Sequence, residues 1–294
     1  QEILTKGLEI QSHEDAGDSF DWKAGLFYMD SETTGLSNRT FPMVFGGILL
    51  GVDEQATDFV LEEENLAAYA SGAWHHSEQL DISLGLRFDR NKKSVDRTKY
   101  STFAASAAGK AMAMTLPPPV QMDETWSKVL PHLGATWHAT KQADLFLRGT
   151  LGYKPGGYSA YGDDLFNPVR FEEEINRTWE AGFSWRSANG ATAASVTAFR
   201  SSIDDYQFEK SAGGTDYVIV NAEEARSEGV ELELLAFLSR NLMLTGTYGY
   251  TESSFQNHLG YQVDHNAITR TPTDFSGNRI PFAPRHTLGL AAQF

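Results

Sequence analysis

The sequence predicts an all-β protein that forms an antiparallel transmembrane β-barrel. Three observations support this fold class. Apolar and polar residues alternate with a period of two along many segments, as in strands whose two faces differ. Aromatic residues recur near the ends of the apolar faces, which is typical of membrane-interface girdles. Short turns alternate with long loops along the chain, so all the short turns lie on one rim.

The clearest strand is expected over residues 80–89. Leu84 and Phe88 belong to its apolar face, and Asp81 and Arg87 belong to its polar face. A slip of one residue would turn the charged side chains toward the apolar side, so the register is strongly specified. About eleven strands are expected in all, over residues 4–11, 22–29, 62–74, 80–89, 125–138, 144–153, 174–185, 191–203, 217–235, 242–251 and 284–294.

The segments between these strands have two lengths. Short turns are expected near residues 15, 77, 141, 188 and 239, and long loops over 30–58, 91–123, 154–173, 204–215 and 255–282. The Ala-rich run 103–114 is compatible with a short helix, and a β-bulge is expected near 222–225. Strand 144–153 ends at Lys154-Pro155-Gly156-Gly157, because proline lacks an amide donor and paired glycines favour turns. The short turns are predicted to be periplasmic and the long loops extracellular.

Composition narrows the possible classes of protein. The 294 residues carry a net charge of −15, which argues against nucleic-acid binding because a phosphate-binding surface needs clustered Lys and Arg. The chain has no Cys, which excludes disulfides, thiol catalysis and Cys-ligated zinc. The chain begins at Gln1 and no signal peptide is visible, so we interpret it as a fragment of a longer protein.

The apolar faces are predicted to form an outward, lipid-facing band around a polar lumen. Aromatic residues near the strand ends would form its girdles, namely Trp74, Trp137, Tyr153, Trp185 and Tyr250.

Several motifs, taken in order, resemble one family. They are Leu8–Ser12 with Trp22–Tyr28, Leu84–Phe88, Lys128–Gly134, Gly152–Tyr158, Asn221–Glu233 and Ile280–His286. Together they resemble the C-terminal barrel of TonB-dependent outer-membrane receptors, the siderophore-receptor branch in particular. The family barrel has 22 strands, so residues 1–294 would supply about half of it. The family's plug domain, its TonB-contacting segment and its terminal strands are expected to lie outside this chain.

The resemblance implies transport, without catalysis, in the outer membrane of a Gram-negative bacterium. The expected cargo is an iron–siderophore or similar ferric complex, and no resident cofactor is expected. The expected partners are outer-membrane lipid and the TonB–ExbB–ExbD complex, reached through the plug, and the receptor is expected to be monomeric.

Loop aromatics and arginines are the candidate ligand contacts, because they stack and make cation–π contacts. These candidates are Arg39, Phe41, Tyr100, Tyr158 and Tyr161. Tyr158 and Tyr161 are alternatively interpreted as anchors at the headgroup level. A second set is predicted to face the lumen: Arg87, Arg148, Glu174, Glu180, Glu231 and Glu233. The alternative for that set is cross-strand pairing.

Metal binding and other functions are less favoured. His75 and His76 are adjacent on a strand and so point to opposite faces, which makes them poor joint ligands. His258, His265 and His286 have no metal-ligand spacing. A passive porin remains an alternative, as does a soluble sandwich with an acidic surface. An outer-membrane enzyme would use Asp163, Asp164 and His265, but no Gly-x-Ser-x-Gly nucleophile motif supports it.

Overall fold

The structure is a computed structural model that describes residues 2–12, 19–45, 48–105, 111–114, 119–160, 169–213, 216–264 and 269–294. These ranges contain strands, and no helix in them is long and apolar enough to cross a membrane. The strands are β1 (Glu2–Gln11), β2 (Phe20–Phe45), β3 (Ile48–Ser77), β4 (Leu80–Ala105), β5 (Ala111–Met114), β6 (Val120–Thr140), β7 (Ala143–Lys154), β8 (Gly157–Ser159), β9 (Val169–Phe171), β10 (Glu174–Arg186), β11 (Thr192–Gly213), β12 (Asp216–Ser239), β13 (Leu242–Asn257), β14 (Leu259–Asp264), β15 (Thr269–Asp274) and β16 (His286–Gln293).

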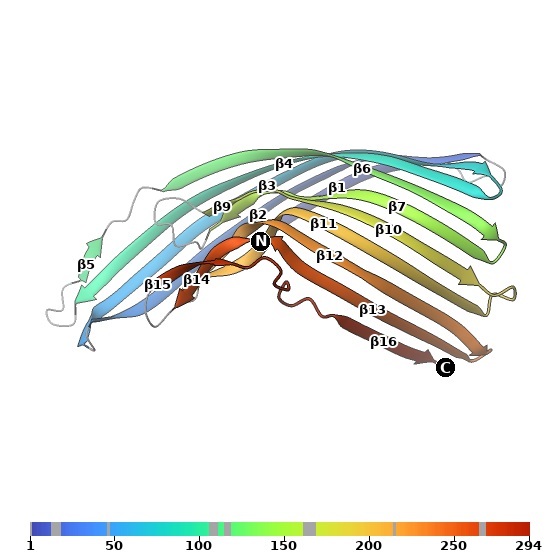
Figure 1. The fold of residues 1–294 in the computed structure, drawn as a ribbon. Coiled ribbons are helices and arrows are strands. Elements are labelled where there is room, and N and C mark those ends of the chain that lie inside the picture. The colour runs from blue at the N-terminus through green and yellow to red at the C-terminus, as the bar shows by residue number, and fades with distance from the viewer. Residues whose placement is uncertain are drawn as a thin grey trace.

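One curved antiparallel sheet dominates the molecule (Figure 1). Its strand order is β1-β2-β3-β4-β6-β7-β10-β11-β12-β13-β16, and β5 pairs with β4 outside this path. Two small hairpins, β8–β9 and β14–β15, lie outside it as well. The eleven strands of the path are the eleven expected from the alternation, in the expected order. The antiparallel all-β prediction is therefore confirmed.

Parts of several expected loops form β-strands instead. β2 and β3 stay paired from Phe20 opposite Trp74 as far as Phe45 opposite Ile48, and β4 runs on to Ala105. The loop expected over 204–215 likewise lies largely in the β11–β12 hairpin. Crossing a bilayer takes about 9–11 residues, whereas β2 has 26 and β3 has 30. Alternation cannot reveal these extensions, because beyond the bilayer both faces of a strand meet water.

The Ala-rich run does not form the short helix considered for it. Residues 103–105 belong to β4, and β5 pairs with β4 from Ala111 opposite Ala104 to Met114 opposite Ser101. Residues 106–110 lie outside the described part of the chain. Alanine favours helices in isolation, but pairing with an existing strand edge overrides that weak preference.

Apolar side chains cover one face of the main sheet. Leu84 is 61% exposed and Trp137 is 50% exposed. Trp74, Trp185 and Tyr250 are exposed on the same face, as the girdle prediction expects. Isolated exposed apolar residues are normal on a soluble protein, but a continuous apolar band marks a surface that contacts lipid or another partner.

Tyr153 departs from the girdle prediction. The pairing of β6 with β7 ends at His132 opposite Thr150, and the last residues of β7 pair with β10 alone. Freed from β6, this end of β7 places the Tyr153 ring against a buried cluster that includes Trp126. Tyr153 is therefore part of the interior packing, and its assignment to the lipid-facing girdle is wrong.

The β-bulge expected near residues 222–225 has its extra residue on the partner strand. The register between β12 and β13 shifts between Glu224, which is opposite Asn257, and Ala225, which is opposite Phe255, so the extra residue is Gln256 of β13. On β11, the other neighbour of β12, Asp205 has a φ of 53°. It has no partner on β12, although Asp204 and Tyr206 on either side of it do. A residue in this left-handed region reorients the strand locally, while the pairing of β11 with β12 continues on both sides of it.

Candidate functional site on the concave face

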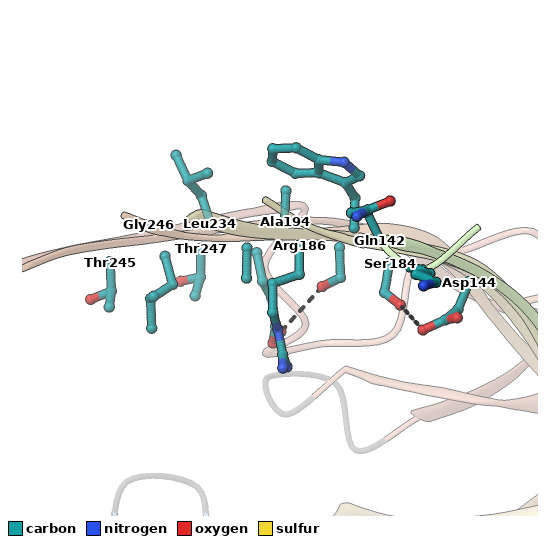
Figure 2. A pocket seen from close by; sticks show the side chains of 15 residues that line it. Gln142, Asp144, Ser184, Arg186, Ala194, Leu234, Thr245, Gly246 and Thr247 are labelled. Carbon is teal, nitrogen blue, oxygen red and sulfur yellow. Dashed lines mark hydrogen bonds between the residues drawn. The ribbon is translucent and has the colours of Figure 1, made fainter. Parts of the chain in front are cut away.

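The second face of the main sheet is polar and concave. Figure 2 shows one end of it, where Asp144, Ser184 and Arg186 point to one side of the sheet and Leu234 points to the other. The polar side holds a groove of about 470 Å³, whose lining comes from β7, β10, β11, β12 and β13. Since lipid does not solvate charged and hydroxyl side chains, this face suits a wet lumen.

The six residues predicted to face the lumen follow the register of this polar face. Arg148 lies directly opposite Glu180, and its guanidinium sits 4.7 Å from the centre of the Phe146 ring. Glu231 and Glu233 lie opposite Thr197 and Ser195 on β11.

Local contacts hold the others of the six. Arg87 forms an ion pair with Asp89, which follows it by two residues on β4. The Glu174 carboxylate accepts a 2.7 Å hydrogen bond from the backbone N–H of Gln207. The Glu174 contact joins β10 to β11, as the cross-strand pairing alternative expects, whereas the Arg87–Asp89 pair lies within β4. Ligand contact by these residues stays a prediction.

A short segment folds back onto the concave face. We call the two described stretches of this segment, residues 155–160 and 169–173, the strap. Within it β8 pairs with β9, from Gly157 opposite Phe171 to Ser159 opposite Val169. The strap therefore covers the inner wall near the long-loop end, where a polar loop is expected from the sequence.

Tyr158 anchors the strap by burial. Its ring is 7% exposed and meets the Trp126 ring edge-on, with 6.4 Å between the ring centres. Val95 of β4 completes this buried cluster, and Leu61, Met122 and Tyr153 pack around it. In this conformation Tyr158 has almost no surface to offer a ligand. Burial also disagrees with the alternative that Tyr158 is a headgroup anchor.

The paired glycines allow the strap to approach the wall. A Cβ on Gly156 would lie 2.6 Å from the Phe171 carbonyl oxygen and 2.7 Å from the Trp126 ring. No side chain fits at that separation, so the backbone reaches Trp126 because residue 156 lacks one. The sequence predicts a turn at these glycines, but their structural role is close packing.

Two ion pairs fasten the strap to β6. Arg170 donates two hydrogen bonds to the Glu124 carboxylate on β6, and Lys128 pairs with Glu173. Glu124 lies beyond the apolar band of β6, and the Arg170 guanidinium keeps the pKa of this carboxyl below its ordinary value. Such two-point pairs fix geometry as well as charge.

Hydrogen bonds from β11 and β12 complete the attachment of the strap. The Gln207 side chain donates to the carbonyls of Pro155 and Glu172, at 3.0 and 2.8 Å. The Ser159 hydroxyl accepts a 2.8 Å hydrogen bond from the Ile219 amide. The strap thus joins β6 to β11 and β12 across the concave face.

The five candidate ligand contacts fare differently. Tyr100 lies on β4 opposite Ala56 and is 55% exposed. Arg39 and Phe41 belong to β2, with backbone partners on β3, and their side chains are not described. Tyr161 lies outside the described residues, as do Asp163, Asp164 and His265 of the enzyme alternative. Ligand contact therefore stays a prediction.

Sequence reasoning missed the Arg170–Glu124 pair and a second buried group near the β14–β15 hairpin. In that group the His258 ring packs against Phe208, Phe255 and Phe275, with 5.1, 5.0 and 5.5 Å between ring centres. Burial lowers the pKa of His258, which favours the neutral ring. The sequence signal was its density of aromatics, which lacks any regular spacing.

Comparison with known proteins agrees with this geometry. The family model for the TonB dependent receptor-like β-barrel matches residues 4–294. The chain belongs to the TonB-dependent receptor family. This is an outer-membrane family of Gram-negative bacteria whose members are transport receptors rather than enzymes.

Named relatives of this receptor chain include two groups. The pesticin receptor of Yersinia enterocolitica is 27% identical over 230 residues, which cover 77% of this chain and 29% of the relative. The metal-pseudopaline receptor CntO of Pseudomonas aeruginosa is 23% identical over 224 residues, which cover 73% and 26%. The chain thus spans less than a third of these curated relatives.

Solved structures share the fold. The ferric yersiniabactin uptake receptor FyuA of Yersinia pestis superposes with a TM-score of 0.71 at 20% identity, over 98% of this chain and 39% of that one. The siderophore receptor PiuA of Acinetobacter baumannii also gives 0.71, at 16% identity, over 99% and 43%. At these identities the likeness establishes the barrel wall alone.

Proposed function

We propose that this receptor chain is the wall of an outer-membrane transporter that takes up an iron–siderophore or similar ferric complex. The family match over residues 4–294 carries the proposal. Energy would come from the TonB–ExbB–ExbD complex through a plug domain. The ferric chelate is cargo rather than a resident cofactor, and the receptor would act as a monomer.

The two faces of the sheet support passage through a lumen. The outer face is apolar and suits lipid, and the concave face carries charged and hydroxyl side chains that suit a wet path. The strap is fastened along the concave face, so a cargo entering from the long-loop side would meet it. Among the candidates whose side chains are described, Tyr100 has an exposed aromatic ring, and a planar aromatic chelate would stack on it.

Iron uptake tests the proposal directly. Cells that lack the gene would be complemented with the intact receptor and supplied with radioactive iron loaded on a catecholate, a hydroxamate or a mixed siderophore. We expect uptake of at least one complex, and we expect deletion of TonB to abolish it. Uptake that survives TonB deletion, or no uptake of any complex by a receptor shown to be folded, would contradict the proposal.

Conductance separates this function from the porin alternative. A plugged receptor reconstituted in a planar bilayer should conduct few ions, whereas a passive porin should conduct steadily without TonB.

A further inference from the structure

Five ionisable side chains form one hydrogen-bonded row across five strands. Asp21, His75, Asp81, His138 and Asp144 come from β2, β3, β4, β6 and β7 in that order. The successive nitrogen–oxygen distances are 2.9, 2.8, 2.9 and 2.7 Å. The row runs along the concave face beside the short turns, and nothing in the proposed uptake of a ferric complex uses it.

The hydrogen bonds determine where the protons are. In both histidines Nδ1 contacts one carboxylate oxygen and Nε2 contacts another. An ionised carboxylate only accepts hydrogen bonds, so each ring nitrogen must carry a hydrogen. A neutral imidazole has one N–H, and its other nitrogen would direct a lone pair at a carboxylate. With all three carboxylates ionised, this arrangement therefore requires both rings to be imidazolium cations.

The surroundings of the row leave this arrangement intact. Ser184 on β10 donates a 3.5 Å hydrogen bond to Asp144. Lys23 and His132 line a hollow with Asp21, and Lys141, Arg186 and Glu233 line the groove with Asp144. Glu78 lies in the short turn between β3 and β4. Within the described part of the chain none of these six forms a salt bridge with the row.

The row is accessible to water. The side chains are between 29% and 38% exposed, so protons exchange with the solvent of the lumen. Pairs this exposed contribute little individually, but here each imidazolium links the strands on both sides of it, and the two rings share the Asp81 carboxylate.

We propose that the row binds protons and thereby holds the strands together at the rim of the sheet that carries the short turns, and we call it the staple. The ligand of the staple is the second proton of each imidazole. While both rings are doubly protonated, four links tie β2, β3, β4, β6 and β7 together. Loss of one proton turns one donor into a lone pair and breaks one link. Stapling therefore weakens as the pH rises and the rings become neutral. This inference does not depend on what the receptor transports.

Nitrogen NMR of the intact receptor, labelled at histidine and held in detergent micelles, tests the protonation. His75 and His138 should both show two protonated ring nitrogens at about pH 7, although an unperturbed histidine is largely neutral there. Assignment would come from the loss of one signal in His75→Gln and another in His138→Gln. Neutral rings at both positions at this pH would overturn the proposal.

Thermal unfolding tests the staple itself. The melting temperature of the wild type should fall as the pH rises from about 6 to about 9.5, the range over which histidine charges are lost. The double variant His75→Gln/His138→Gln should melt lower at about pH 6 and show little of this fall.

His132→Gln is the matched control for that experiment. His132 lies on β6, an even number of residues from His138 and so on the same face, but outside the row. It should keep the wild-type pH dependence. An equal fall in the double variant and the wild type would refute the staple even if both fold normally.

Discussion

The guanidinium of Arg170 grips the carboxylate of Glu124 from across the concave face, with 2.5 Å between Nη2 and Oε1. The same guanidinium lies 5.9 Å from the centre of the Trp126 ring. One strap residue thus contacts both a charged and an aromatic group of β6. The pair connects residues 46 apart in sequence, and it holds the strap beside the ring that buries Tyr158.

Removing this ion pair should loosen the strap. We expect Arg170→Ala to destabilise the strap by about 1–2 kcal/mol, because a charge-assisted two-point contact is lost from a site that is one-third exposed. Hydrogen exchange of the amides of residues 157–159 should become faster. Arg177→Ala is the control, since Arg177 pairs with Asp204 away from the strap. Unchanged exchange in Arg170→Ala would show that packing alone holds the strap.

Acid should remove the same contact. The pKa of Glu124 is lowered by its hydrogen bonds with Arg170, so its stabilisation is complete above about pH 4.5. It is lost as the pH falls through the lowered pKa. The difference in strap exchange between the wild type and Glu124→Gln should therefore be constant from about pH 8 to 5 and narrow below about pH 4. A difference that widens in acid would contradict this assignment.

A methyl group should test the close approach at the paired glycines. Gly156→Ala should destabilise the strap by more than about 1 kcal/mol, because the new Cβ would overlap the Phe171 carbonyl and the Trp126 ring. Gly152→Ala is the matched control, since its Cβ would sit 3.5 Å from the Asn176 Cβ, an ordinary contact. Limited proteolysis near the strap compares the two variants. Equal cleavage would mean that the strap shifts at little cost.

Charge on the outer face should be costly. Leu147 is 48% exposed on the apolar face of β7, and Leu147→Arg should cost about 2–4 kcal/mol of folding free energy if that face lies against the bilayer midplane. Thr150→Arg, on the polar face of the same strand, should cost much less. Urea unfolding of the intact receptor in lipid vesicles measures both. Equal costs would argue against the lipid assignment of this face.

The alternation of apolar and polar residues was sufficient to predict the order of the strands in the wall, but not how far the strands extend beyond the bilayer. Leu84 and Asp81 differ in face because one meets lipid and the other water, so the register was readable. Beyond the bilayer both faces of a strand meet water, so the contrast between an apolar and a polar face disappears. β2 and β3 continue there as strands, although the sequence shows no alternation that predicts them. Tyr153 was predicted to be a girdle residue because its place in the alternation of β7 is regular. The alternation does not show that β7 separates from β6 before Tyr153, which turns the ring toward the buried cluster.

The sequence by itself determined the all-β class, the order of the eleven strands of the wall, and the likeness to TonB-dependent receptors. These depend on local period and on motif order, which need no knowledge of distant contacts. The tertiary structure decided that residues 155–160 and 169–173 fold inward, that Tyr158 is buried, and that His75 and His138 lie in one row of carboxylates. Each of these joins residues from strands far apart in sequence. Such contacts follow from sheet curvature and register, which no single segment encodes.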